Sequence, residues 1–292
     1  MKKRFIRFMV SIIIIIIVFI IYKGNLELLY IDGIDNYSSK YIYVMNRENK
    51  NIEYEKNSNS RVYPASLTKI MTTIVAFEHI ENLSDIAPVD IDAYQIMVAK
   101  NSSMAGFYGK EVVTYRDLLY GTMLPSGGEA ANSLAIHVAG SIENFVKLMN
   151  EKALELGMEN THFTNVEGLD DDKQYTSAQD MAKLLDYALE NGDFRAIFTK
   201  KEFVTTKTLD HPNGIVLKST VLSRLDDIHQ DGFEIIGGKS GTTSKAGQCW
   251  ATLGIKNNQE YICIVMGAPL DDISNPDMKQ REDTIKLYKR VE

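Results

Sequence analysis

The sequence predicts a layered fold in which helices fill the middle of the chain and strands lie at both ends. Residues 40–47 and 51–55 carry the alternating apolar pattern of a β-hairpin, with a turn at 48–50. Further strand patterns return only after residue 200, and helical patterns occupy the stretch between. We therefore expect the first strands to pair with the last in one layer, and the helices to pack beside them.

The helices are predicted from apolar residues at helical spacing and from signals at their ends. In 67–80 the apolar residues recur with the spacing of a buried helix. Thr114 and Asp117 form a possible cap pair at the start of a second helix over 114–123. The remaining predicted helices cover 129–138, 142–156 (closed by Gly157), 178–190 and 280–289. The late strands are predicted at 203–208, 214–219, 233–239, 250–256 and 261–266.

Composition and charge bound the function classes. The chain has 292 residues, of which 45% are apolar and 24% charged, as in an ordinary globular protein. Its formal net charge of -7 argues against a nucleic-acid-binding surface. A turn at 257–258 would place Cys263 opposite Thr252 and point Cys249 to the other face, so we expect two small buried cysteines and no implied disulfide.

The first residues of the chain differ in kind from the rest. Four basic residues precede the almost unbroken apolar run 8–22. This run is short for a membrane span of about 20 residues and lies at the upper limit of the apolar region of a signal peptide, roughly 7–15 residues. No small-x-small cleavage site follows, so 1–24 is predicted as an uncleaved signal anchor in preference to a cleaved signal peptide. The positive-inside rule puts the N-terminus in the cytoplasm and the linker 25–37 and the domain 38–292 outside.

The stretch Ser66-Leu67-Thr68-Lys69 places a hydroxyl nucleophile and an amine one helical turn apart, and Ser66 is the only serine with a lysine three residues on. A serine hydroxyl needs a base to take its proton. A lysine serves as that base only if burial or a nearby cation lowers its pKa from about 10.4. Alone, the motif also describes a helix cap followed by a solvated lysine.

A second polar element, Lys239-Ser240-Gly241, ends the apolar run 233–238. Lys239 is a candidate for the second cation, and a glycine allows a substrate backbone to lie close along a strand edge. Alone, this element is equally typical of a polar exit from a strand.

In combination, these motifs resemble those of the penicillin-recognising serine acyltransferases, which use Ser-x-x-Lys, Ser-x-Asn and Lys-Thr/Ser-Gly. The chain is most similar to the low-molecular-weight D-alanyl-D-alanine carboxypeptidases, over about 38–292. The stretches that carry the resemblance are 65–72, 118–132, Thr161-His162-Phe163 with Gly168-Leu169, and 239–243. The resemblance implies an α+β fold of the serine β-lactamase/transpeptidase type, a mostly antiparallel sheet flanked by helices, with the active site between sheet and helices.

The resemblance also implies roles for particular residues. Ser66 is the acylated nucleophile, Lys69 its base, and Ser126 a second hydroxyl that relays a proton to the leaving D-alanine. Lys239 tunes this network, and the backbone N–H groups of Ser66 and Thr242 form an oxyanion hole. The residues expected to bind the substrate, chiefly its terminal carboxylate, are Lys239, Ser240, Gly241, Thr242 and Arg281.

One position departs from the family pattern. The second motif reads Ser126-Gly127-Gly128, with glycine where the family usually has an asparagine that holds the acyl part of the substrate. Asn132, one helical turn further on, either replaces that amide or bonds within its own helix.

The expected reaction is removal of the terminal D-alanine from peptidoglycan stem peptides, without metal or cofactor, and β-lactams should acylate the same serine. D,D-endopeptidase or weak transpeptidase activity and a catalytically weak penicillin-binding sensor stay open, as does the physiological role. A β-lactamase is disfavoured because Glu167-Gly168-Leu169-Asp170 does not match its Glu-x-x-Leu-Asn loop. A zinc carboxypeptidase is disfavoured because the histidines at 79, 137, 162, 211 and 229 form no ligand-spaced pair with a carboxylate. Since the sequence ends just after the closing helix, we expect neither a second β domain nor a C-terminal anchor.

Overall fold

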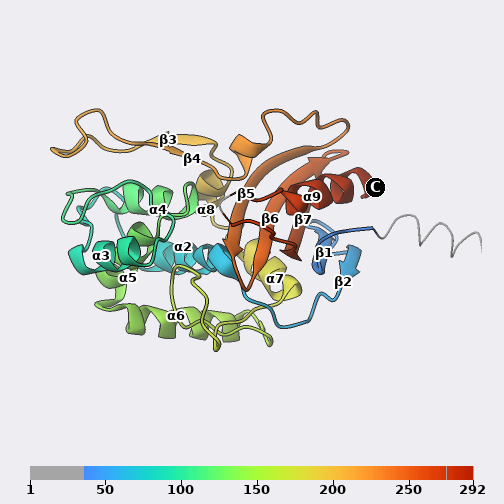
Figure 1. Cartoon of the computed structure of the whole chain (residues 1–292), viewed down its shortest axis with the longest axis horizontal. Coiled ribbons are helices and arrows are strands. Elements are labelled where there is room, and N and C mark those ends of the chain that lie inside the picture. The colour runs from blue at the N-terminus through green and yellow to red at the C-terminus, as the bar shows by residue number, and fades with distance from the viewer. Residues whose placement is uncertain (1–35, 274, 292) are drawn as a thin grey trace, which may run out of the picture. The chain divides into compact units, whose positions relative to one another are not determined.

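A computed structural model describes residues 36–273 and 275–291 (Figure 1). The predicted membrane segment 1–24 and most of the linker 25–37 lie outside the described residues. Within the described ranges, no helix is long and apolar enough to cross a membrane. Residues 38–292 form one compact unit.

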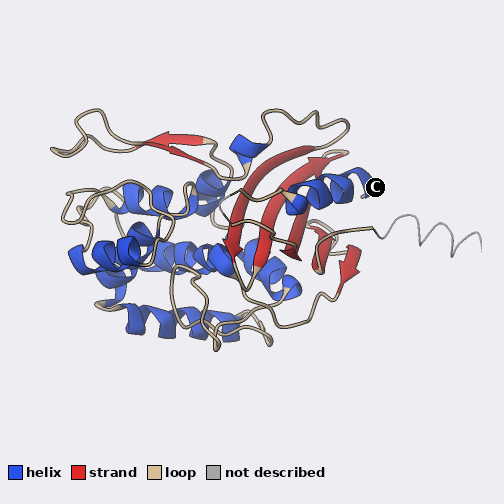
Figure 2. Ribbon diagram, in the orientation of Figure 1, coloured by secondary structure: helices blue, strands red, loops and turns tan. Residues whose placement is uncertain are grey.

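The main sheet has five strands, and both ends of the chain contribute to it (Figure 2). Their order is β2 (Ile52–Lys56), β1 (Tyr41–Asn46), β7 (Gln259–Ala268), β6 (Gly247–Lys256) and β5 (Glu234–Thr243). Every neighbouring pair is antiparallel. Because β1 pairs with β7, the predicted closure of the first strands onto the last is confirmed.

The two faces of the sheet pack against different helices, since side chains alternate along each strand. On β6, Cys249, Ala251 and Leu253 belong to the large core shared with the helical layer. Thr252 points the other way, and its hydroxyl lies 3.1 Å from the hydroxyl of Tyr288 on α9 (Lys279–Arg290). Thr252 also pairs with Cys263, as the sequence predicted, and both cysteines are buried and free.

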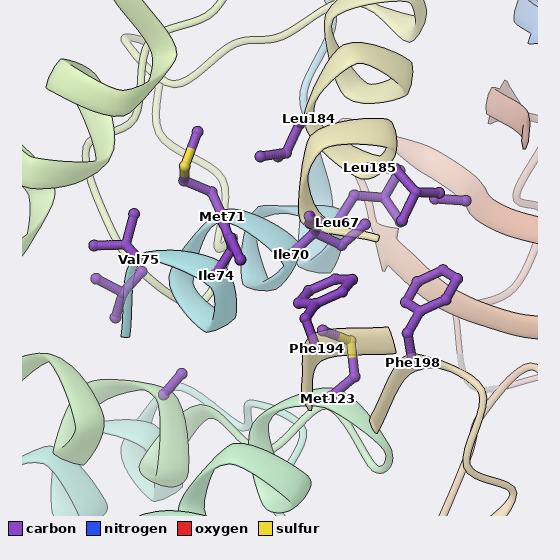
Figure 3. Close-up of a cluster of buried hydrophobic side chains, with 14 of the residues drawn as sticks. Leu67, Ile70, Met71, Ile74, Val75, Met123, Leu184, Leu185, Phe194 and Phe198 are labelled. Atoms are coloured by element: carbon purple, nitrogen blue, oxygen red, sulfur yellow. The ribbon is translucent and has the colours of Figure 1, made fainter. Parts of the chain in front are cut away.

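Helix α2 (Thr68–His79) runs through the centre of the helical layer, and its residues from Thr68 to Ala76 are all buried. Figure 3 shows its apolar side chains with those of the neighbouring helices: Leu67, Ile70, Met71, Ile74 and Val75 with Met123, Leu184, Leu185, Phe194 and Phe198. Burying each such side chain contributes about 1.5–3 kcal/mol, which holds the start of α2 in place. The helices around it are α4 (Tyr115–Met123), α5 (Gly128–Ala139), α6 (Ile142–Glu155), α7 (Ala178–Ala188) and α8 (Gly192–Phe198).

The structure differs from the predicted elements in two respects. Helices α3 (Ile91–Ala99) and α8 were not predicted. The strands predicted at 203–208 and 214–219 are shorter, β3 (Glu202–Val204) and β4 (Val216–Lys218), and pair only with each other. Ser66 lies just before the predicted helix 67–80, in a short 3-10 turn, η1 (Ala65–Leu67), that leads into α2.

Candidate active site

Ser66 is held where the loop before α2 meets a strand edge and a second loop. Ala65 has a left-handed φ of +47°, a strained conformation that packing must stabilise. Gly168 packs so closely that a Cβ there would lie 2.0 Å from the Ala65 carbonyl oxygen. A Cβ on Gly241 would lie 2.9 Å from the Ser66 nitrogen. The backbone of Ser66 is therefore clamped between two glycines from distant parts of the chain.

The Lys69 amine lies beside the Ser66 hydroxyl. It donates to Ser66 Oγ at 3.2 Å and to the backbone oxygen of Glu167 at 2.6 Å. Lys69 is buried, and this burial lowers its pKa to about 8, although the nearby carboxylates of Glu167 and Glu129 oppose the shift. At pH 7 roughly a tenth of an amine with this pKa is uncharged and able to accept the Ser66 proton, far more than for an ordinary lysine.

The second serine and the second lysine also meet. Ser126 follows α4 with a left-handed φ of +69°. The Lys239 amine, which is fully buried on β5, donates to Ser126 Oγ at 2.8 Å and to the Ser240 backbone oxygen at 2.7 Å. Burial, followed by the positive charges of Lys69 and Arg224, holds the pKa of Lys239 well below its ordinary value. Each of the two serines thus accepts a hydrogen bond from a lysine whose pKa is lowered.

The strand that carries Lys239 lies at the edge of the described sheet, which leaves backbone groups free to meet an extended peptide. Ser240 shares a 2.7 Å hydrogen bond with the hydroxyl of Thr220, and Thr242 is half-buried on the same strand. Gly241 lies between them and next to Ser66. The residues predicted on this strand therefore lie on the same edge as the nucleophile.

Arg281 lies on α9, where its Nη1 donates to the backbone oxygen of Arg224 at 2.9 Å and reaches Asp227 Oδ1 at 3.4 Å. Arg281 therefore braces the short turn η2 (Leu222–Arg224) that precedes β5. Arg224, whose charge acts on Lys239, belongs to no motif of the sequence. Its position in the chain, shortly before the strand that carries Lys239, is the only sequence feature that connects it with the site.

Two side chains crowd position 128, where the family pattern has asparagine. A Cβ on Gly128 would lie 2.7 Å from Met97 Sδ and 2.9 Å from Ser102 Oγ. The Asn132 amide donates to the Gly128 backbone oxygen at 2.9 Å, so its N–H bonds within its own helix. Met97 and Ser102, which the sequence analysis did not single out, occupy the space of the missing side chain.

These features together define a class of protein, the serine acyltransferases of transpeptidase-like fold. In this class one serine lies beside a buried amine of lowered pKa, a second serine is bound to a second lysine, and both lie next to an exposed strand edge. The chain belongs to the peptidase S11 family of D-alanyl-D-alanine carboxypeptidases, which it matches over residues 32–270.

Similar proteins support this assignment. The chain is 28% identical over 261 residues to D-alanyl-D-alanine carboxypeptidase DacF of Bacillus subtilis, covering 87% of this chain and 65% of DacF. It is 34% identical over 227 residues to DacC of Escherichia coli, covering 75% of this chain and 54% of DacC. It thus spans about half to two thirds of these relatives. The crystal structure of the Streptomyces K15 DD-transpeptidase superposes with a TM-score of 0.77 at 28% identity, covering 87% of this chain and 97% of that one.

Proposed function

We propose that this protein is a serine-type D-alanyl-D-alanine carboxypeptidase that trims peptidoglycan stem peptides through an acyl-enzyme at Ser66. The observation that carries the proposal is the 3.2 Å contact between the Lys69 amine and Ser66 Oγ, together with the lowered pKa of that amine. Membership of the family and the antiparallel sheet edge beside Ser66 support it.

The proposed reaction begins when the neutral Lys69 amine takes the proton of Ser66. The Ser66 oxygen then attacks the carbonyl carbon between the two D-alanines, and the backbone N–H groups of Ser66 and Thr242 stabilise the negative oxygen that forms. Ser126 delivers its proton to the nitrogen of the departing D-alanine and regains one from the Lys239 amine bonded to it. A water molecule then attacks the ester carbonyl and gives one proton back to Lys239 through Ser126. The proton held on Lys69 returns to the Ser66 oxygen as the ester bond breaks, which releases the shortened peptide and restores the free enzyme. β-Lactams acylate Ser66 in the same way, because their ring amide takes the place of the scissile bond.

The terminal carboxylate of the substrate is proposed to lie on the β5 side of Ser66, where positive charge accumulates. Ser240 and Thr242 offer hydroxyl donors there. The Arg281 guanidinium keeps donors beyond those used toward Arg224 and Asp227, and its buried Nε has no acceptor among the described residues.

The first experiment measures D-alanine release from diacetyl-Lys-D-Ala-D-Ala by the full chain beside Ser66→Ala. We expect release that vanishes in the variant, and covalent labelling by a fluorescent penicillin that vanishes with it. Labelling without release would contradict the carboxypeptidase proposal and favour a penicillin-binding sensor or an enzyme that needs a cross-linked substrate.

A second candidate, weak transpeptidation, is favoured by the similarity to a DD-transpeptidase. It differs from hydrolysis only in the acceptor of the acyl group. Adding glycylglycine or D-alanine to the same assay therefore tests it, since a transpeptidase would form a new peptide product at the expense of the hydrolysed one.

We also propose that residues 1–24 anchor the protein in the cell membrane as a single pass, with the catalytic domain outside the cytoplasm. The basic residues before the apolar run support this orientation. Protease treatment of intact cells, followed by detection of the domain, tests it. Recovery of the domain in the medium, cleaved near residue 25, would contradict it.

A further inference from the structure

A cavity of about 180 Å³ lies beside the catalytic centre, and neither the motifs nor the proposed mechanism uses it. It is bordered by helices α3 and α5, the first residue of α6 and the loop that ends at Glu167. Its lining combines apolar residues, among them Ile96, Met97 and Ile142, with the polar residues Lys100, Asn132 and Glu167.

Glu167 contributes two different groups. Its backbone oxygen accepts the hydrogen bond from Lys69 and lies 3.4 Å from Ser66 Oγ. The residue also lines the cavity, although it is only 5% exposed. The carboxylate oxygen Oε2 is buried and has no hydrogen-bond donor among the described residues. Since leaving a buried carboxylate oxygen unpaired costs free energy, this atom is an acceptor for a group that enters the cavity.

Asn132 adds a second acceptor to the same wall. Its amide nitrogen is used inside α5, where it donates to the Gly128 oxygen at 2.9 Å. Its side-chain oxygen has no donor in the part of the chain that the structure describes. A carboxylate and an amide oxygen that border one cavity match a ligand with several N–H donors, and a primary ammonium has three.

In the proposed binding mode, this cavity lies on the acyl side of the substrate. The cations Lys239 and Arg281 lie toward β5 and α9, where the terminal carboxylate is proposed to bind. Glu167 approaches Ser66 from a separate loop. A peptide whose carboxylate meets the cations extends its preceding residues away from them, on the side from which Glu167 approaches.

We propose that the cavity binds the side-chain ammonium of the diamino acid that precedes the two D-alanines. This inference rests on the proposed function and specifies its substrate class. The methylenes of that side chain would pack on Ile96 and Met97, and its ammonium would donate to the Glu167 carboxylate and the Asn132 oxygen. Lys100, which is exposed at the wall, carries a like charge and weakens this binding.

The test compares two peptides, L-Lys-D-Ala-D-Ala with a free side-chain ammonium and its Nε-acetyl form, both acetylated at the α-amine. For the wild-type full chain we expect kcat/KM at least about tenfold higher for the free ammonium, equivalent to about 1.4 kcal/mol. Glu167→Gln should bring this ratio close to one, whatever its effect on absolute rates. Lys100→Ala should raise the ratio.

Glu159→Gln is the matched control, because it removes the same charge from an exposed position. It should keep the wild-type ratio. Equal rates of the two peptides in the wild type would overturn the proposal. So would an equal slowing of both peptides in Glu167→Gln, because Glu167 would then act only through Lys69.

A second readout separates this inference from the proposed function. The rate at which Ser66 is acylated is measured for a penicillin with an aminobutyl side chain and for its N-acetyl form. This ratio needs no D-alanine release. A preference for the ammonium that Glu167→Gln removes supports the cavity even if the carboxypeptidase assay fails, and equal acylation rates overturn it.

Discussion

Lys239 and Ser126 are 113 positions apart in the chain, yet the lysine amine lies 2.8 Å from the serine hydroxyl. The contact joins the edge strand β5 to the turn that leads from α4 into α5. In the proposed mechanism, Lys69 serves the attack by Ser66, and Lys239 serves the leaving group through Ser126. Both lysines are buried, so their amines interact with these serines and not with bulk solvent.

The first prediction concerns this pair. Ser126→Ala and Lys239→Met should each slow acylation of Ser66 by penicillin about ten- to a hundredfold, in line with about 1.5–3 kcal/mol for a hydrogen bond to a charged group. The double variant should lose much less than the product of the two effects, because the groups act as one unit. Strictly multiplicative losses in stopped-flow acylation would contradict the coupling.

The second prediction is a pH dependence. Lys69 acts as a base only when uncharged, so kcat/KM should rise as pH increases through its pKa of about 8. The Glu129 carboxylate favours the charged form of Lys69. Glu129→Gln removes this effect, lowers the pKa of Lys69 and should move the rising limb of the profile to lower pH.

This variant is conservative, because the glutamine oxygen can still accept from the backbone N–H groups of Ala105 and Gly106, which Glu129 Oε1 now holds at 2.7 and 3.0 Å. The profile is measured with one peptide substrate at saturating and at limiting concentration. A limb that stays in place or moves to higher pH would show that Glu129 does not influence the base.

The third prediction separates backbone strain from a steric clash at two glycines. Both Gly157 and Gly168 have left-handed φ angles, of +62° and +89°. Nothing lies within 4 Å of a Cβ on Gly157, so Gly157→Ala should cost only about 1–2 kcal/mol of stability. Gly168→Ala adds the clash with the Ala65 oxygen, so it should cost more and should also displace Ser66.

Urea unfolding and penicillin acylation of both variants test this. We expect Gly157→Ala to acylate at the wild-type rate and Gly168→Ala to lose most acylation even where it remains folded. Equal stabilities and equal acylation rates would argue that the loop at Gly168 does not position the nucleophile.

Much of the fold could be predicted because its signals are local. The alternation of apolar residues in 40–47 and 261–266 identified strands that pair as β1 and β7. The placement of Ser66 and Lys69 on one face depends on only four consecutive residues of the chain. The contact of Lys239 with Ser126 is not local, and only the resemblance to a family brought these two residues into one hypothesis.

The remainder could not be predicted because tertiary contacts decide it. In α3 only Ala93 and Met97 are buried, so its apolar pattern is weak, and its one clear signal is the cap at Asp90. Glu167 was considered only as part of a motif that did not match. Its backbone and its side chain face different neighbours, which no sequence pattern reports.

The last prediction concerns the glycine that departs from the family pattern. Gly128→Asn should destabilise the protein by about 1–3 kcal/mol, because the new side chain meets Met97 and Ser102. Because Met97 Sδ is the nearest obstacle, at 2.7 Å from the added Cβ, Met97→Ala should relieve part of the cost. The free energy of unfolding of Gly128→Asn/Met97→Ala should then exceed the value expected from adding the two single effects. Additive losses in urea unfolding would mean that Met97 is not what excludes asparagine. Acylation of Ser66 by penicillin is then compared in the double variant and in Met97→Ala alone. Faster acylation of the double variant would mean that an asparagine amide at position 128 helps the reaction in this site.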